Sequence, residues 1–496
     1  MYYNILDFGG KGDSKTDSTE AIKMAINTCT KAGGGTVVIP AGQYKTGPIE
    51  LKSNITLQVE AGAVVIFQPD FQRYSPVRTR WSGYECYGFS PLLYGNGLKN
   101  VTITGRGILE GQGEAWWDVY HQLKNGETYL STMTETLKQL NHEKLAIKTN
   151  LVEWDSQFLR PPLLQLFECE HVLLEGVTLQ NSPFWNTHLV YCHDVTVDKV
   201  TFKNPANAPN GDGLDLDSCT YVRVSNCHFD VGDDCLCLKS GINEDGRNIA
   251  KPTEHVTVQN CTMKAGHGGV VFGSENSGGI RNVTVSNCLF IGTDRGIRLK
   301  TNRARGGYIE NILISNVYME HVLCPFTINS FYRYGIDDDD PLMASPEAVE
   351  ITEKTPIINH IHLHQITAKQ CRAAAGFLYG LPEKPIEDVS LRHVTIEMTE
   401  DLQEQGGEPD MVQDALIMAG AGMFGKYIHR LTCHDVKIKT RQGPALQLEE
   451  MKNVQLDNVE LVRKHDETPV IEMKNCEDVH VSGKQAEKEE YYLACD

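Results

Sequence analysis

The sequence predicts a right-handed parallel β-helix with an N-terminal cap that contains a short helix. Three observations favour this all-β solenoid: a nine-residue phrase of alternating polar and apolar residues recurs, its copies mostly start 23 to 34 residues apart, and no helical spacers separate them. Alternation with a period of two is typical of strands. Short strands repeated at this interval suit coils that stack on one another.

Residues 1–70 are expected to form the cap and the first strands. Asp17, followed three residues later by Glu20, predicts a capping box that opens a helix ending near Lys31. The glycine run at 33–35 stops this helix, and residues 36–39 resemble a strand. Because the glycines follow the helix and no Lys-Ser/Thr pair completes the motif, a phosphate-binding loop is disfavoured.

Residues 71–496 are expected to form one continuous β-helix domain that carries the catalytic residues. The sixth position of the phrase is asparagine in five copies, as expected where the chain turns a tight corner. These asparagines are Asn226, Asn260, Asn287, Asn316 and Asn458. The copies of the phrase span residues 171–179, 194–202, 221–229, 255–263, 282–290, 311–319, 360–368, 388–396, 430–438 and 453–461.

Cysteines occupy the seventh position in three successive copies, Cys227, Cys261 and Cys288. They are expected to stack as an interior ladder of small apolar side chains, because paired Cys-x-x-Cys spacing typical of metal sites is absent.

Three insertions interrupt the repeat, near residues 112–165, 330–358 and 398–428, and are expected to form loops that border a groove. The first carries Trp116, Trp117, Tyr120 and Trp154, and the second carries the acidic run 337–340.

The charge balance restricts the possible partners. The 496 residues include 46 Lys and Arg against 65 Asp and Glu, a formal net charge of −19, which argues against nucleic acid and anionic membranes. No apolar run is long enough to span a membrane. The start shows no secretory signal, and the 15 cysteines are therefore expected to be mostly free buried thiols of a cytoplasmic protein. The sequence leaves the oligomeric state open.

Polar residues that follow the phrase in four successive coils are expected to share one face. They are Asp212, then Asp233 and Asp234 after a bend at Gly232 that turns both toward solvent, then His267, then Arg298 and Lys300. Neighbouring carboxylates raise the pKa of at least one of them, as glycoside hydrolysis requires. The two cations, extended by Arg303 and Arg305, suit the carboxylate of an acidic sugar. Lys239 is either a further substrate contact or part of a structural ion pair, and Asp215, Asp217 and His188 are taken as structural.

Four motifs in this order resemble the polygalacturonases, glycoside hydrolase family 28: Asn210-x-Asp212, Gly232-Asp233-Asp234, Gly266-His267-Gly268 and Arg298-x-Lys300. The resemblance runs from Asp7-Phe8-Gly9 to Gly306-Gly307-Tyr308. It implies a right-handed β-helix, inverting hydrolysis of α-1,4-linked galacturonate in pectic chains, and no metal or other cofactor. One departure is Gly211, where many members carry threonine.

By this resemblance Asp233 is the general acid, Asp212 and Asp234 activate water, and His267 tunes the protonation of the acid. Arg298 and Lys300 hold the substrate carboxylate, with Asn210 and Lys239 as further substrate-binding candidates. The stretch 78–86 and the Trp-rich insertion resemble those of bacterial exo-acting members, which favours cleavage from a chain end. A rhamnogalacturonan or other pectin-backbone hydrolase, a calcium-dependent pectate lyase and a non-catalytic carbohydrate-binding β-helix are the alternatives.

Overall fold

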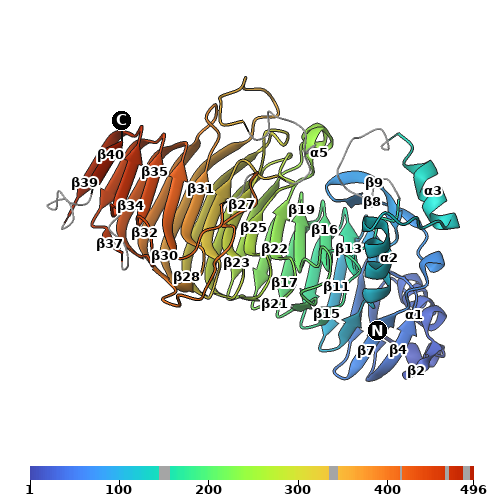
Figure 1. Cartoon of the computed structure of the whole chain (residues 1–496). Coiled ribbons are helices and arrows are strands. Elements are labelled where there is room, and N and C mark those ends of the chain that lie inside the picture. The colour runs from blue at the N-terminus through green and yellow to red at the C-terminus, as the bar shows by residue number, and fades with distance from the viewer. Residues whose placement is uncertain (144–156, 334–344, 414–415, 464–468, 484–491, 496) are drawn as a thin grey trace. The chain divides into compact units, whose positions relative to one another are not determined.

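The computed structural model describes residues 1–143, 157–333, 345–413, 416–463, 469–483 and 492–495. The chain divides into two compact units. The first unit contains Met1–Cys237 and Thr253–Val256, and the second contains Leu238–Pro252 and Thr257–Asp496. Both consist mainly of short parallel strands, with strands of successive coils side by side within each unit (Figure 1). None of the helices in the described part of the chain has the length and apolarity that crossing a membrane requires.

The cap begins with the expected helix. Helix α1 (Thr19–Lys31) buries one apolar face, formed by Ala21, Ile22, Ala25, Ile26 and Cys29. The capping box is wrong in its detail, because the N-cap is Ser18 and makes no side-chain capping bond. Asp17 instead accepts hydrogen bonds from the backbone N–H and the hydroxyl of Thr19. The short 3₁₀ helices are η1 (Ile5–Phe8) and η2 (Phe71–Arg73).

Parallel strands of the first unit stack with aligned register. Val101 pairs with Val172, Val172 with Val195, and Val195 with Val222. Because aligned valines occupy one face of successive strands, their side chains form a continuous apolar column. The strands are β1 (Tyr2–Asn4), β2 (Asp13–Asp17), β3 (Gly35–Ile39), β4 (Gly42–Thr46), β5 (Ile49–Glu50), β6 (Ile55–Val59), β7 (Ala63–Phe67), β8 (Pro76–Trp81), β9 (Tyr84–Phe89), β10 (Leu93–Asn96), β11 (Lys99–Gly105), β12 (Ile108–Glu110), β13 (Leu164–Phe167), β14 (Glu170–Glu175), β15 (Thr178–Gln180), β16 (Thr187–Val190), β17 (His193–Asp198), β18 (Thr201–Lys203), β19 (Leu214–Asp217), β20 (Thr220–Ser225), β21 (His228–Asp230) and the start of β22 (Asp234–Lys239).

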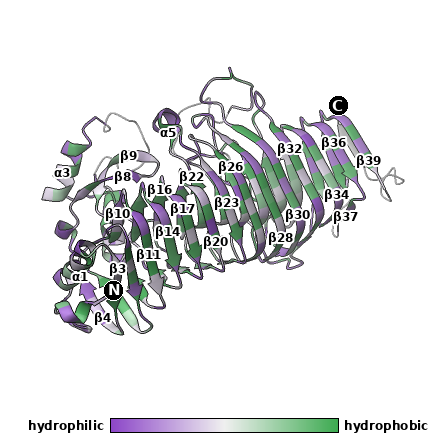
Figure 2. Cartoon of the chain, turned by 180° about the vertical axis from the view of Figure 1, so that it is seen from behind, coloured by the Kyte–Doolittle hydropathy of each residue, from purple (hydrophilic) through white to green (hydrophobic). Residues whose placement is uncertain are grey.

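The second unit repeats this arrangement with longer strands. Val283 pairs with Ile312, Ile312 with Ile361, and Ile361 with Val389. Hydrophobic and hydrophilic residues alternate along these strands (Figure 2). The elements are α5 (Asn243–Ile249), β23 (Thr253–Gln259), β24 (Thr262–Lys264), β25 (Gly268–Phe272), β26 (Ile280–Ile291), β27 (Arg295–Lys300), β28 (Tyr308–Glu320), β29 (Cys324–Asn329), β30 (Ile357–Cys371), β31 (Ala374–Tyr379), β32 (Ile386–Met398), β33 (Ala421–Lys426), β34 (Ile428–Lys439), β35 (Leu446–Glu449), β36 (Lys452–Asp457), β37 (Glu460–Val462), β38 (Ile471–Lys474), β39 (Glu477–Ser482) and β40 (Tyr492–Cys495).

The corner asparagines are confirmed. Asn226, Asn260, Asn287, Asn316 and Asn458 all have left-handed backbone conformation, with φ between 49° and 57°. Asparagine tolerates this conformation better than other residues with a side chain. The first residue of each phrase is also left-handed, His171 and Asp388 among them, which the composition of that position did not indicate. Two left-handed corners therefore bend the chain in each repeat, between strands at Asn226 and within the longer strands β26 and β28 at Asn287 and Asn316. The stacked strands confirm the parallel β-helix.

Interior thiols form ladders. Cys227, Cys261 and Cys288 are buried, as predicted. A further ladder of free thiols in the first unit, Cys169, Cys192 and Cys219, was not predicted. The thiols of Cys192 and Cys219 donate hydrogen bonds to the carbonyls of Leu166 and Leu189 in the preceding coil, at 3.2 and 3.1 Å. These thiols therefore pack as small core residues.

The insertions differ in structure. The described part of the first insertion contains two helices, α2 (Glu114–Lys124) and α3 (Thr132–Leu140), where a loop was expected. The Trp116 ring is fully buried and packs against Phe71, Phe89 and Phe158. That packing fixes α2 against the aromatic residues around it. Trp154 and the acidic run 337–340 lie outside the described residues. In the third insertion, the described residues 399–413 and 416–420 form a loop that leads into β33.

Candidate active site

The acids of the first unit stand where strands begin. Asp212 lies two residues before β19, and Asp234 is the first residue of β22. Asp233 precedes it in a bend and is half-buried, whereas Asp212 and Asp234 are buried. The bend at Gly232 is confirmed, but the expectation that both acids face solvent is wrong. The backbone N–H of Asp234 donates to the Asp233 carboxylate at 3.0 Å, which fixes the bend between them.

Two of these carboxylates lie close together. Oxygen atoms of Asp212 and Asp234 and the sulfur of Cys237 all lie within 4.8 Å of one another. Burial, followed by the charges of Asp234, Asp212 and two further acids, raises the pKa of the intervening Cys235 thiol well above its ordinary value. Concentrated negative charge of this kind favours binding of a proton or a polarised water. In the described part of the chain these three side chains are also the one group with metal-ligand spacing.

Glycines allow the acid-bearing turns to pack. A Cβ at Gly232 would lie 2.6 Å from the carbonyl oxygen of Pro205, and a Cβ at Gly211 would lie 2.9 Å from the Ala208 side chain. Both contacts are too short for a residue with a side chain. Glycine at 211 therefore matches the close approach of Ala208, which explains the departure from threonine.

Asn210 is held by an arginine near the end of the first insertion. The Arg160 guanidinium donates to the Asn210 amide oxygen at 2.8 Å and to the carbonyls of Pro183 and Pro209. It lies over the ring of Tyr120 from α2, at 4.2 Å. Arg160 thus connects this helix to the turn that carries Asp212.

A buried polar network supports the next strand ends. Asp217 accepts a hydrogen bond from Arg80 of β8 at 2.7 Å and lies 3.2 Å from the His188 ring, whose other nitrogen lies 3.0 Å from Gln165. All four side chains are at most 3% exposed. The partners of Asp217 and His188 agree with their structural interpretation, and Asp215 is likewise fully buried.

The predicted cations lie in the second unit. Arg298 and Lys300 are on alternate positions of β27, and both lie over the ring of Tyr332, at 5.5 and 5.2 Å. Arg298 donates to a buried carboxylate, Asp410, at 2.8 Å. Asp410 also accepts from the Thr327 hydroxyl at 2.8 Å. Burial would raise the pKa of Asp410, but Arg298 and Arg295 hold it below the ordinary value.

The loop that carries Asp410 is fastened to the same strand. Arg295, the first residue of β27, donates to the carbonyls of Pro409 and Glu408 at 2.9 and 2.7 Å. The Asn329 side chain donates to the carbonyl of Met411 at 3.1 Å. The 399–420 loop therefore borders the predicted cations, as expected for the third insertion.

Lys239 forms a structural ion pair with Glu275, which is one of the two roles expected for it from the sequence. Its ammonium group lies 3.1 Å from Glu275, and both side chains are buried. Burial would raise the pKa of Glu275, but Lys239, Lys300 and Arg305 lower it. A direct contact of Lys239 with substrate stays a prediction.

The expectation that Arg303 and Arg305 extend the positive patch is wrong. Arg303 makes two hydrogen bonds to the Glu383 carboxylate, at 2.7 and 2.9 Å. Arg305 is fully buried and donates to Asn243 at 2.7 Å and to the Ser274 carbonyl at 2.8 Å. Both arginines therefore hold loops of the second unit in place. His267 is exposed immediately before β25, and its predicted tuning role stays a prediction.

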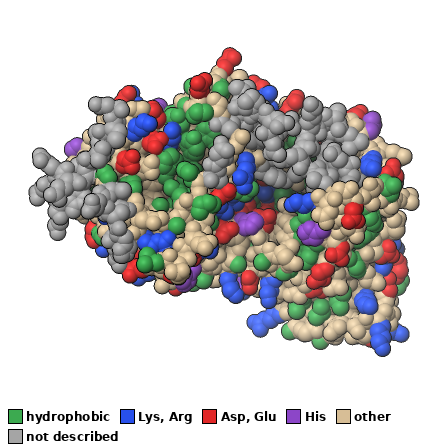
Figure 3. Space-filling view, viewed as in Figure 1, with side chains coloured by type: hydrophobic (Ala, Val, Ile, Leu, Met, Phe, Trp, Pro, Cys, Tyr) green, Lys and Arg blue, Asp and Glu red, His purple; other side chains and the backbone are tan. Residues whose placement is uncertain are grey.

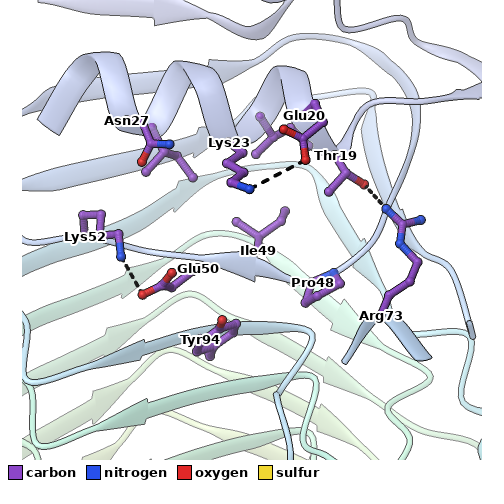
Figure 4. A pocket seen from close by; sticks show the side chains of 12 residues that line it. Thr19, Glu20, Lys23, Asn27, Pro48, Ile49, Glu50, Lys52, Arg73 and Tyr94 are labelled. Atoms are coloured by element: carbon purple, nitrogen blue, oxygen red, sulfur yellow. Dashed lines mark hydrogen bonds and ion pairs between the residues drawn. The ribbon is translucent and has the colours of Figure 1, made fainter. Parts of the chain in front are cut away.

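A separate pocket lies at the cap, between α1 and strands β5 and β10 (Figure 4). Its charged side chains pair with one another, Lys52 with Glu50 at 2.5 Å and Lys23 with Glu20 at 3.7 Å. Arg73 donates to the Thr19 hydroxyl at 2.8 Å. This pocket contains none of the predicted site residues.

Known proteins resemble this chain over most of its length. The model for "Glycosyl hydrolases family 28" matches residues 153–405, and that for "Rhamnogalacturonase A/epimerase, pectate lyase-like" matches residues 2–150. A probable polygalacturonase of Vitis vinifera is 30% identical over 405 residues, covering 80% of this chain and 74% of the relative. An exo-poly-alpha-D-galacturonosidase of Dickeya chrysanthemi is 27% identical over 344 residues, covering 64% of this chain and 55% of that one.

Among solved structures, the hyperthermoactive exopolygalacturonase from Thermotoga maritima matches with a TM-score of 0.73 and 32% identity, covering 88% of this chain and 91% of that one. The fold, the four ordered motifs and these matches agree. This chain belongs to glycoside hydrolase family 28 and is a glycoside hydrolase of the polygalacturonase type.

Proposed function

We propose that this enzyme acts from one end of pectic galacturonan and releases galacturonate by inverting hydrolysis of α-1,4 linkages. The observation that carries the proposal is the protein packed against the two ends of β19, the strand that begins after Asp212 and ends at Asp217. Arg160 binds Asn210 there and packs on α2, while Arg80 of the β8–β9 hairpin binds Asp217. Protein packed against one side of the acids would favour a chain terminus as substrate, because an interior sugar needs room on both sides. The exo-acting relatives from Dickeya and Thermotoga support this specificity.

The three acids have different proposed tasks. Asp233, the half-buried one, donates a proton to the leaving oxygen. Asp212 and Asp234, whose oxygens lie within 4.8 Å of one another, together activate the attacking water. Arg298 and Lys300 bind the carboxylate of the substrate, and His267 tunes the protonation of Asp233, both on the strength of the family motifs. Inversion requires that the acid and the base pair lie on opposite faces of the sugar ring.

Product analysis tests the exo proposal. Hexagalacturonate labelled at its reducing end should yield monogalacturonate from the earliest time point, together with oligomers shortened one residue at a time. Mixed oligomers at early times would mean endo cleavage. Proton NMR should detect the β-anomer first, and initial release of the α-anomer would contradict inversion.

Asp233→Asn should lower kcat by about 10²–10⁴-fold, the usual contribution of general acid catalysis. Asp230→Asn, in the same coil but outside the motifs, is the matched control and should retain activity. Equal losses in both variants would argue against the assigned role of Asp233.

A rhamnogalacturonan backbone is the second candidate substrate, because the N-terminal 2–150 match bears the name of a rhamnogalacturonase A/epimerase, pectate lyase-like family. Release of products from rhamnogalacturonan oligomers, with none from galacturonan, would favour it. A calcium-dependent lyase would instead give an unsaturated, ultraviolet-absorbing product, and EDTA would abolish the formation of that product.

The expected cytoplasmic location is also a proposal, which cell fractionation tests.

A further inference from the structure

A pocket of about 320 Å³ lies in the second unit, next to the loop that holds Arg298. Asp410 connects this pocket to Arg298, since its side chain lines the pocket and also binds the Arg298 guanidinium. The face drawn in Figure 3 has a group of hydrophobic side chains over this part of the second unit. The pocket is lined by Phe377, Tyr379, Pro409, Asp410, Val412, Gln413, Leu416, Met418, Phe424, Lys426, Gln447 and Glu449.

The strand register places this pocket on the same face as the predicted cations. Along one column Arg298 pairs with Thr327, Thr327 with Phe377, and Phe377 with Phe424. In the parallel column, Lys300 pairs with Asn329, Asn329 with Tyr379, and Tyr379 with Lys426. Side chains at aligned positions point the same way, and neighbouring strands lie about 4.8 Å apart. The aromatic rings therefore begin about 10 Å from Arg298 along the stack.

Three rings line the pocket. Phe377 and Phe424 stack with centroids 5.4 Å apart at 23°, and Tyr379 meets both edge-on at 6.0 Å. Phe424 and Tyr379 are only partly buried. Flat rings that retain exposure beside a pocket suit the C–H face of a sugar, and the polar Gln447 offers hydrogen bonds to its hydroxyls.

The charges around the pocket are balanced. Lys426 lies 2.9 Å from Glu449, and Asp410 lies 2.8 Å from Arg298. A substrate carboxylate entering here would meet Asp410 and Glu449 and would compete for cations that already have partners. Desolvating such a group costs free energy that these pairs do not offset. The lining therefore favours an uncharged sugar, in contrast to the carboxylate-binding role of Arg298 and Lys300.

We propose that this pocket is a subsite for an uncharged sugar residue of the pectic chain, either a methyl-esterified galacturonate or a neutral sugar. It lies two to three strands beyond the residue held by Arg298 and Lys300. The proposal rests on the proposed function, because it assigns a remote part of the same substrate. Phe377 and Tyr379 lie inside the family 28 match, whereas Asp410, Phe424, Lys426 and the other lining residues after 405 lie outside it.

Phe424→Ala tests the stacking surface. With wild-type enzyme, KM should be lower for a hexamer esterified on its remote residues than for an all-acid hexamer, and digalacturonate should not reach the pocket. The substitution should raise KM for the esterified hexamer by roughly three- to tenfold, the usual value of an aromatic contact, with kcat and the KM for digalacturonate unchanged. Leu313→Ala, an exposed apolar residue on β28, is the matched control. Phe424→Leu keeps the apolar bulk, and it replaces Phe424→Ala in this test if the alanine variant unfolds at too low a temperature to be assayed.

Glu449→Gln tests the charge argument. It leaves Lys426 without its counter-ion, so the preference should shift toward the all-acid hexamer. A hexamer whose remote residues are neutral sugars distinguishes the two kinds of uncharged sugar. KM should be lower than for the all-acid hexamer with the esterified chain, with the neutral-sugar chain or with both. Equal KM changes for dimer and hexamer in Phe424→Ala, or no preference for uncharged residues in wild type, would overturn the proposal. If wild type cleaves no unesterified galacturonan oligomer, the proposed function fails instead.

Discussion

Arg298 illustrates how a site residue depends on a partner far away in the sequence. Its guanidinium binds Asp410, which also accepts hydrogen bonds from Thr327 and from the backbone N–H of Met411. A carboxylate held by three donors cannot move with the arginine, so it fixes the orientation of the guanidinium. Hydrogen bonds between charged groups contribute about 1.5–3 kcal/mol, enough to decide how Arg298 presents itself to substrate.

Asp410→Asn should therefore raise KM for oligogalacturonates by roughly tenfold, with a smaller change in kcat, because Arg298 loses its oriented counter-ion but remains in place. Steady-state kinetics on trigalacturonate measures the change in KM and the change in kcat separately. Glu408→Gln is the control, since only the backbone carbonyl of Glu408 holds Arg295, while its side chain pairs at the surface with Arg333. A fall in kcat at constant KM would contradict this positioning role for Asp410.

The motif residues were predictable from sequence because each lies at a nearly fixed distance from a repeat. Asp410, Glu275 and Arg160 were not, since they reach the site residues from loops and insertions without periodicity. A buried acid inside a long insertion was the one available signal for Asp410. The burial of Asp234 was also missed, because alternation locates a strand but does not reveal what covers it.

At the scale of elements, the left-handed corners determine where each coil bends, between two strands at Asn226 and inside one longer strand, β28, at Asn316. Asn316 has φ 53°, and its side-chain amide donates to Asn287 in the preceding coil at 2.6 Å. This conformation costs most residues with a Cβ about 1–2 kcal/mol, whereas glycine adopts it without that cost and asparagine at a lower cost because its short polar side chain bonds locally. The asparagine pattern was visible in the sequence. The matching corner at the first phrase position was not, because histidine, tyrosine and arginine also occupy it.

Asn316→Ala should lower the free energy of unfolding by about 1–2 kcal/mol through backbone strain. Asn316→Gly should recover most of that loss, although the amide ladder is broken in both variants. Urea denaturation monitored by circular dichroism makes the comparison. Equal destabilisation by alanine and glycine would show that the hydrogen bond, and not the backbone conformation, is the main contribution.

For the molecule as a whole, buried charge links stability to pH. Glu275 is buried among Lys239, Lys300 and Arg305, and its folded pKa is lowered. A carboxyl with a lowered folded pKa stabilises the fold above its unfolded pKa of about 4.3 and loses that contribution as pH falls through the folded value. The second unit is therefore expected to lose stability in acid, and its neutral-pH stability requires an ionised Glu275.

Glu275→Gln should destabilise the protein at neutral pH by about 3–5 kcal/mol, because the buried ammonium group of Lys239 loses the carboxylate charge that lies 3.1 Å from it. The difference from wild type should begin to shrink as pH falls below about 4.3, where Glu275 of the unfolded chain takes up a proton, and should continue to shrink until the native carboxyl is protonated at its lower pKa. Urea midpoints between neutral pH and pH 3 measure this trend. A difference that grows toward acid would contradict the sign of the pKa shift.

The aligned register also has a consequence for folding. Val172 pairs with Val195, a separation of 23 residues, whereas Val101 pairs with Val172 across 71 residues because the first insertion lies between them. Closing the longer loop costs only about 1 kcal/mol more in chain entropy. Each coil can therefore form on the edge of the one before it, in the order in which the ribosome delivers them. The insertions lengthen a few closures, and contacts elsewhere stay local enough for fast propagation.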